Sequence, residues 1–173
     1  MSTSAAQYSE RLASLRAELA ARKLNGFVIP LTDEHMSEYV GGYAQRLAWL
    51  TGFGGSAGSA VVLAEKAAIF VDGRYTLQVR DQVDDALYAY CDLPATQPAD
   101  WLADHVSAGA RIGYDPWLHT RDWVAKTQAT LESKGGELVA VDSNPVDAVW
   151  RDRSAPSLAP ATPHGLEYAG KAH

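Results

Sequence analysis

Residues 59–71 read SAVVLAEKAAIFV, two apolar runs that flank a short polar stretch at residues 64–66. Short apolar runs bounded by a turn signal are typical of buried β-strands. We therefore predict adjacent strands at residues 59–63 and 67–71, joined as a hairpin. The remaining elements are predicted on either side of this hairpin.

The N-terminal residues are predicted to form an amphipathic helix. Ser4 and Gln7 fit the capping box that often starts a helix. Asn25 and Gly26 tolerate a left-handed C-terminal cap, so we expect the helix to end there. One stripe of apolar side chains follows helical spacing, namely Tyr8, Leu12, Leu15 and Leu19.

Strands and helices alternate along the rest of the chain. A strand is predicted at residues 27–29, and residues 33–49 are expected to hold short helical segments interrupted at Gly41 and Gly42. The elements predicted after residue 72 are, in order, a helix at 73–83, a strand at 87–91, a helix at 98–106, a strand at 111–114, a helix that Thr120 caps and that Gly135 and Gly136 end, a strand at 138–141 and a helical turn at 145–150. Because strands separated by helices need crossover connections, the predicted fold class is α/β, with a mixed, largely parallel sheet covered by helices on both faces.

Composition excludes several classes of protein. The 173 residues carry 15 Lys and Arg against 21 Asp and Glu, a net charge of −6, which argues against a nucleic-acid partner. The apolar runs fall far short of the roughly 18–20 residues that span a bilayer, so no membrane partner is expected. The single Cys91 excludes an internal disulfide and a cysteine-based metal cluster. We expect a soluble domain of cytoplasmic type.

The C-terminal part of the chain differs in composition. Three of the eight prolines, at positions 156, 160 and 163, lie in a stretch with little apolar content, which favours an extended linker. We predict a domain at residues 1–153, a proline-rich linker at 154–165 and the start of a following domain at 166–173. The chain is therefore expected to be a piece of a longer one.

A glycine-rich motif at residues 54–58 (GGSAG) matches G-x-S-x-G, the nucleophile elbow of serine hydrolases. That elbow needs a strand before the serine and a helix after it. Here the residues before the motif have helical character and those after it form a predicted strand, so a tight glycine turn is favoured. The same reversed order argues against a dinucleotide-binding fingerprint that starts at Gly52. A serine hydrolase that uses Ser56 stays the third of three hypotheses.

The segment Asp72-Gly73-Arg74-Tyr75 follows a predicted strand. Asp72 is suited to cap the next helix and to pair with an arginine, and this structural interpretation is favoured. Alternatively, Arg74 or Tyr75 lines a cleft at the carboxyl ends of the strands, where such sheets bind ligands. Among five histidines without metal-ligand spacing, His35 alone lies in a polar loop just after a strand, where a solvated side chain is favoured.

Several spaced motifs together resemble the N-terminal domain of aminopeptidase P. They are Ser37-Glu38-Tyr39, Arg46, residues 50–60 (LTGFGGSAGSA), residues 72–78 (DGRYTLQ), residues 144–153 (NPVDAVWRDR) and residues 168–171 (YAGK). That family is related to creatinase and prolidase and removes an N-terminal residue that precedes proline. The resemblance covers nearly the whole chain and implies a creatinase-like N-terminal domain with ribonuclease H-like layering.

The resemblance also implies which chemistry to expect. Two divalent metal ions, usually manganese, would be held by carboxylates and a histidine of a C-terminal catalytic domain in cis, and those ligands have no counterpart in this sequence. The segment itself would be non-catalytic, would shape and gate the cleft for short proline-containing peptides and would support a homodimer. A stand-alone α/β binding module is the second hypothesis. The residues expected to face the cleft are His35, Tyr39, Arg46, Arg74 and Tyr75.

Overall fold

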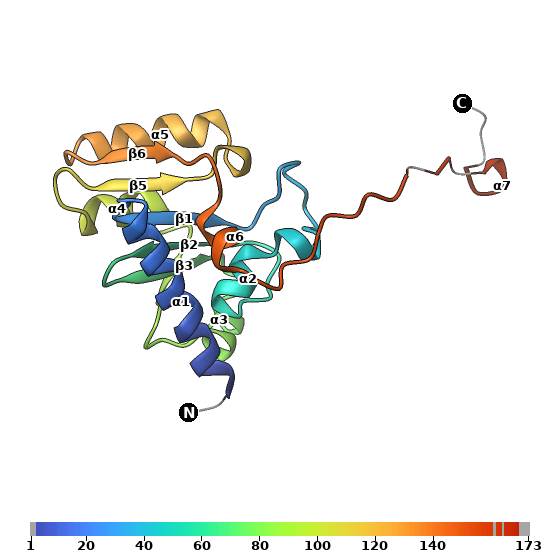
Figure 1. Cartoon of the computed structure of the whole chain (residues 1–173), viewed down its shortest axis with the longest axis horizontal. Helices are drawn as coiled ribbons and strands as arrows, with labels where there is room; N and C mark the ends of the chain where they lie inside the picture. The colour runs from blue at the N-terminus through green and yellow to red at the C-terminus, as the bar shows by residue number, and fades with distance from the viewer. Residues whose placement is uncertain (1–2, 161, 164, 170–173) are drawn as a thin grey trace.

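A six-stranded mixed sheet forms the centre of the computed structural model, which describes residues 3–160, 162–163 and 165–169 (Figure 1). Its strands lie in the order β4-β3-β2-β1-β5-β6. Strand β2 pairs antiparallel with β1 and β3, and the other three pairings are parallel. This confirms the predicted α/β class. The bounds are β1 Gly26–Pro30, β2 Ser59–Leu63, β3 Ala67–Val71, β4 Ala89–Asp92, β5 Arg111–Tyr114 and β6 Glu137–Ala140.

The predicted hairpin is confirmed with its bounds, and the amide of Leu63 donates to the Lys66 carbonyl at its turn (2.8 Å). Successive side chains of a strand point to opposite faces of the sheet. Val62 accordingly packs in one hydrophobic cluster, whereas Val61 packs in a second one. The consecutive apolar residues of the hairpin are therefore explained by burial on both faces.

Helices cover each face. Helices α1 (Thr3–Ala21), α2 (Arg46–Thr51), α3 (Gln78–Gln82) and α6 (Pro145–Val149) contribute to one cluster, and α4 (Pro98–His105) and α5 (Arg121–Glu132) to the other. The predicted stripe of α1 is buried at Leu12, Leu15 and Leu19. Thr120 caps α5 as predicted, since its hydroxyl accepts from the Trp123 amide (3.2 Å). The short helices η1 (Gly42–Ala44) and η2 (Pro116–Leu118) lie in connections, and α7 (Leu166–Ala169) is the last element in chain order.

Two predicted helix bounds were wrong. Helix α1 ends at Ala21, and the left-handed position falls on Lys23 (φ 57°) instead of Asn25 or Gly26. Those two residues interact with the sheet instead. The Asn25 side chain accepts from the amide of Arg111 (2.8 Å), and Gly26 begins β1. The predicted cap at Ser4 falls outside the described side chains.

The helix predicted from residue 73 begins only at Gln78. The Asp72 carboxylate accepts from the Arg74 amide (2.9 Å) in a stretch of turns at residues 73–77, so Asp72 pairs with an arginine as predicted but does not cap α3, which follows Leu77. At the other end of the chain, residues 154–160 are exposed and run away from the sheet (Figure 1). The division into a domain, a linker and a following domain stays a prediction, and its last residues, 170–173, lie outside the described ones. No helix in the described part of the chain is long and apolar enough to cross a bilayer.

An aromatic cluster beside α5 encloses His119. Its ring lies 3.8 Å from the Trp123 ring, and Nδ1 is 3.0 Å from the Asp115 carbonyl oxygen. Within the described residues its buried Nε2 has no hydrogen-bond partner. Burial of the imidazole lowers the pKa of His119, while the nearby Asp115 carboxylate and carbonyl act in the opposite direction.

Replacing His119 with Phe is predicted to flatten the dependence of stability on pH in the acid range. The unfolded chain binds a proton at His119 with a pKa near 6.5, whereas the folded chain resists this proton. The stabilisation is therefore complete above that pH and is lost progressively as the pH falls from it through the lower pKa of the folded chain. Urea unfolding at a series of pH values measures the slope, with His35→Gln in an exposed loop as the control. Equal slopes for the parent and His119→Phe would contradict this explanation.

Candidate functional site

All five residues predicted to face a cleft lie at one edge of the sheet, where the parallel strands end; four are in loops, and Arg46 is the first residue of α2. We call this the carboxyl edge and define it by residues 31–46, 52–58 and 72–77. The glycine loop at 52–58 belongs to it because Pro30 of β1 pairs with Ser59 of β2, and the Leu31 amide donates to the Gly58 carbonyl (3.1 Å). The carboxyl ends of parallel strands are the usual ligand side of such sheets.

Arg74 is held firmly yet remains open to solvent. Its Nε and Nη2 donate to the Asp72 carboxylate at 3.0 and 2.7 Å, and its guanidinium lies 5.2 Å from the centre of the Tyr75 ring. The hydrogen bonds from Arg74 lower the pKa of the Asp72 carboxyl. The Arg74 side chain is still 66% exposed. A fixed, exposed guanidinium is suited to bind an anionic group such as a carboxylate.

Tyr75 packs against the glycine loop from the segment that follows β3. Its hydroxyl lies 2.6 Å from Ser56 Oγ, and its ring meets the buried Phe53 ring edge-on at 5.6 Å. The hydrogen bond with Ser56 lowers the pKa of the Tyr75 hydroxyl. A Cβ at Gly55 would lie only 2.3 Å from Phe53 Cζ and 2.9 Å from Tyr75 Cδ1. The loop therefore needs glycine here so that the two rings can pack, which supports the structural interpretation of the motif.

The same loop lacks the order of a nucleophile elbow. It follows helix α2 and precedes strand β2, the reverse of the strand-turn-helix arrangement. The hydroxyl of Ser56 pairs with Tyr75, a group without the basicity of an imidazole. The structure thus gives no support to a hydrolase that uses Ser56.

His35 and Tyr39 lie in the loop after β1 and are 74% exposed (side chain) and 84% exposed, respectively. The buried Asp33 shapes this loop, since its carboxylate accepts from the amides of His35 (3.0 Å) and Ser37 (2.9 Å). The bond from the Ser37 amide is the main cause of the lowered pKa of Asp33. Both predicted residues are therefore exposed side chains on a well-anchored loop.

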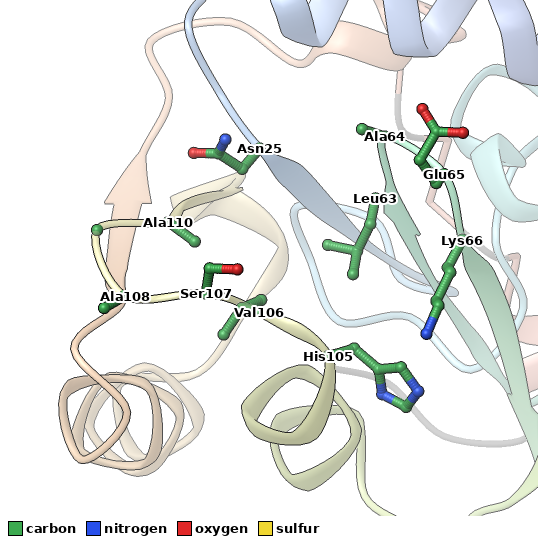
Figure 2. Close-up of a pocket in the computed structure, with 11 residues that line it drawn as sticks. Asn25, Leu63, Ala64, Glu65, Lys66, His105, Val106, Ser107, Ala108 and Ala110 are labelled. Carbon is green, nitrogen blue, oxygen red and sulfur yellow. The ribbon is translucent and has the colours of Figure 1, made fainter.

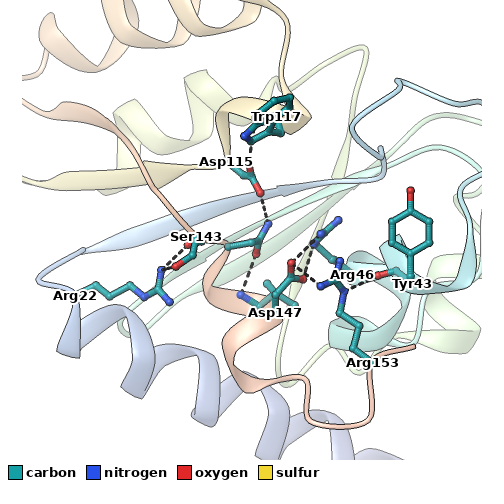
Figure 3. Close-up of polar contacts among 10 residues, drawn as sticks. Arg22, Tyr43, Arg46, Asp115, Trp117, Ser143, Asp147 and Arg153 are labelled. Atoms are coloured by element: carbon teal, nitrogen blue, oxygen red, sulfur yellow. Dashed lines mark hydrogen bonds and ion pairs between the residues drawn. The ribbon is translucent and has the colours of Figure 1, made fainter. Parts of the chain in front are cut away.

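Arg46 has a different environment from the other four candidates. It is only 5% exposed, and its Nε and Nη2 donate to the two oxygens of Asp147 at 2.7 and 2.8 Å (Figure 3). Arg153 reaches the same carboxylate (3.1 Å) and donates to the Tyr43 carbonyl (2.7 Å). Arg46 thus ties α2 to α6 and to the segment that leaves the domain. Its contacts fit this structural role.

The structure does not bring all five candidates together. Arg74 and Tyr75 touch, whereas Arg46 is buried in the Asp147 cluster. The carboxylate of Glu38, next to Tyr39, is close enough to help stabilise the Arg74 cation. Sequence reasoning missed Asp147 and the partnership of Ser56 with Tyr75, although Asp147 lies inside the quoted motif at 144–153. Neither partner is a sequence neighbour, so no local signal was available.

A cavity of about 330 Å³ opens at the opposite edge of the sheet (Figure 2). The turn between β2 and β3, the end of α4 and the residues before β5 line it, and its polar members are Asn25, Glu65, Lys66, His105 and Ser107. None of the five candidates borders it. In the part of the chain that the structure describes, no three His, Cys, Asp or Glu side chains are placed to hold a metal ion. The His, Cys, Asp and Glu side chains of the described residues therefore do not fit a two-metal centre.

Comparisons with known proteins agree on one family. The model of the creatinase/prolidase N-terminal domain matches residues 11–151. Human Xaa-Pro aminopeptidase 2 is 38% identical over 145 residues, which are 84% of this chain and 22% of that protein. A probable Xaa-Pro aminopeptidase P of Pyricularia oryzae is 38% identical over 171 residues, 94% of this chain and 27% of that protein. The chain thus spans about a quarter of the length of these relatives.

Solved structures show the same likeness. An X-prolyl aminopeptidase from Caenorhabditis elegans, described as a cytosolic enzyme with a di-nuclear active site, superposes with a TM-score of 0.82 at 33% identity. The match covers 95% of this chain and 29% of that one. The N-terminal domain of the cytoplasmic peptidase PepQ from Mycobacterium tuberculosis gives 0.61 at 26% identity, over 81% of this chain and 98% of that one.

Gly55→Ala is predicted to destabilise the fold by about 1–3 kcal/mol, because the new methyl group overlaps the rings of Phe53 and Tyr75. Gly73→Ala is the matched control, since no atom lies within 4 Å of the position that its Cβ would take and its φ is not positive. Urea unfolding midpoints compare the two variants. If both unfold at the same urea concentration, the close packing of the glycine loop is wrong.

Asp147→Ala is predicted to destabilise the fold by about 3 kcal/mol, because it leaves the buried Arg46 guanidinium without its counter-ion. Asp152→Ala removes a neighbouring exposed carboxylate and should change the free energy of unfolding by less than about 0.5 kcal/mol. The difference is measured by chemical denaturation. A loss of similar size in both variants would show that the Asp147 cluster does not stabilise the fold.

Proposed function

The chain belongs to the creatinase/prolidase N-terminal domain family, and on this basis we propose that it is the first, non-catalytic domain of a longer metal-dependent Xaa-Pro aminopeptidase. The proposal is supported by relatives about four times as long, two of which carry that activity in their names. A relative with 33% identity has a di-nuclear active site. The two metal ions, which we propose to be manganese, would be bound by a C-terminal catalytic domain in cis.

Within that protein, the carboxyl edge would form one wall of the substrate cleft and limit the length of the peptide. The observation that carries this role is Arg74, an exposed guanidinium held in place by Asp72 and Tyr75. Such a group is suited to bind the free carboxylate of a short peptide. The exposed Tyr39 and the nearby His35 offer a ring surface and a hydrogen-bonding group for a proline-containing substrate.

We further propose a cytoplasmic homodimer. The location is supported by the C. elegans relative, which is described as cytosolic. The dimer is proposed from the family resemblance, and the mass of the full-length protein in solution would test it. A stand-alone binding module is the competing hypothesis, which predicts that the chain has no catalytic domain attached to it in the cell.

Arg74→Ala in the full-length enzyme is predicted to raise KM about tenfold for short Xaa-Pro peptides with a free C-terminal carboxylate, with kcat nearly unchanged. The loss of a charge-assisted hydrogen bond to the substrate is the cause. Amidated peptides lack that charge and should show little change. Arg80→Ala, an exposed arginine on α3, is the control. Unchanged KM for both peptide forms in Arg74→Ala would refute the proposed role.

Arg46→Ala separates the two kinds of arginine. Because Arg46 is buried against Asp147, its removal should lower the denaturant midpoint rather than alter peptide discrimination. Arg74→Ala should alter peptide discrimination and leave the denaturant midpoint nearly unchanged. A selective loss of carboxylate-bearing substrates in Arg46→Ala, with stability retained, would instead place Arg46 in the cleft.

A further inference from the structure

The hydroxyl of Ser56, in the glycine loop, contacts Tyr75, a residue proposed to face the substrate. The packing of the glycine loop does not explain why a serine stands at this position. The close approach at Gly55 explains why a glycine stands beside it, but the Ser56 side chain is itself exposed. An exposed serine contributes little to a core. Its hydroxyl nevertheless lies 2.6 Å from the hydroxyl of Tyr75.

Two contacts fix the Tyr75 ring. The buried Phe53 holds the ring by an edge-on contact at 5.6 Å, and Ser56 holds the hydroxyl at the far end of the ring. An aromatic ring that is held by its side and by its tip has little freedom to swing. Without the bond to Ser56, the ring would lose the hydrogen bond that holds its hydroxyl end.

The Tyr75 ring in turn packs against one side of the Arg74 guanidinium. The guanidinium lies 5.2 Å from the ring centre, within the range of a cation–π contact, and the Asp72 carboxylate holds it from another direction. A guanidinium on a flexible side chain binds a carboxylate best when its orientation is set beforehand. The contacts therefore form a series that runs from Ser56 through Tyr75 to Arg74.

We propose that Ser56 is a positioning residue for peptide recognition, which acts through the Tyr75 ring to orient the Arg74 guanidinium toward the carboxylate of a short peptide. This rests on the function proposed above. It gives the serine of the G-x-S-x-G motif a role in substrate specificity without any covalent chemistry.

The test compares variants of the full-length enzyme on matched Xaa-Pro peptides with a free or an amidated C-terminus. Ser56→Ala should raise KM about threefold to tenfold for the free peptide, as expected for one lost hydrogen bond, and leave KM for the amide and the kcat values unchanged. Ser56→Thr keeps the hydroxyl and should restore the parent KM. Ser107→Ala, at the opposite edge of the sheet, is the matched serine control.

A double-variant cycle tests whether the two hydroxyls act as one pair. Tyr75→Phe keeps the ring under Arg74 and removes only the hydroxyl, so it should match Ser56→Ala, and the double variant should be no worse than either. In the isolated chain, Ser56→Ala should leave the urea midpoint unchanged and raise the pKa of Tyr75, which ultraviolet difference spectra of the phenolate report. A purely structural role would lower the midpoint.

The outcomes distinguish the inference from the function on which it rests. If Arg74→Ala discriminates the two peptides but Ser56→Ala does not, the positioning role is wrong and the proposed function stands. If Ser56→Ala weakens both peptides equally, Ser56 acts on something other than Arg74 and the inference is overturned. If Arg74→Ala itself fails to discriminate, the proposed recognition role of Arg74 is refuted, and the inference about Ser56 is overturned with it.

Discussion

Burial of the central strands on both faces is the constraint on which the structure depends. Val61 and Phe70 face one cluster, Val62 and Ile69 face the other, and all four are fully buried. Such a sheet is stable only between two layers of helices, so all connections between successive strands except the β2–β3 hairpin contain a helix and meet the sheet at an edge. Polar side chains that could meet a ligand are thereby confined to the edges, and the parallel strands direct most of these loops to the carboxyl edge.

The loops that follow these strands share one local device. Asp33, Asp72, Asp115 and Asn144 stand after β1, β3, β5 and β6, and each side chain accepts a hydrogen bond from the backbone amide two residues later. This turn satisfies an amide that leaves the sheet and fixes the direction of the next residues. It places Arg74 directly after the Asp72 turn and Tyr39 beyond the Asp33 turn. The proposed recognition edge is thus built from short polar turns on a rigid apolar sheet.

The sequence predicted most of the features that depend on residues close together in the chain, and it missed those that depend on residues far apart. The hairpin and the Thr120 cap depend on neighbouring residues, and both were predicted with their positions. The start of α3 was missed because an Asp after a strand makes the same bond to the amide two residues later whether a turn or a helix follows: Asn144 makes it at the start of α6, whereas Asp72 makes it in a turn, with residues 73–77 between it and α3. The burial of Arg46 was not predictable, because its partner Asp147 lies 101 residues away in sequence. The family resemblance supplied the motif residues but not which of them are exposed.

A crystal structure of the full-length protein with a bound Xaa-Pro peptide that ends in a free carboxylate is the decisive test of the proposed recognition edge. We expect the Arg74 guanidinium to lie within hydrogen-bonding distance of that carboxylate, with the Tyr75 ring still packed beside it. A peptide carboxylate bound by other residues, with the carboxyl edge of this domain facing solvent away from the metal centre, would contradict the proposal.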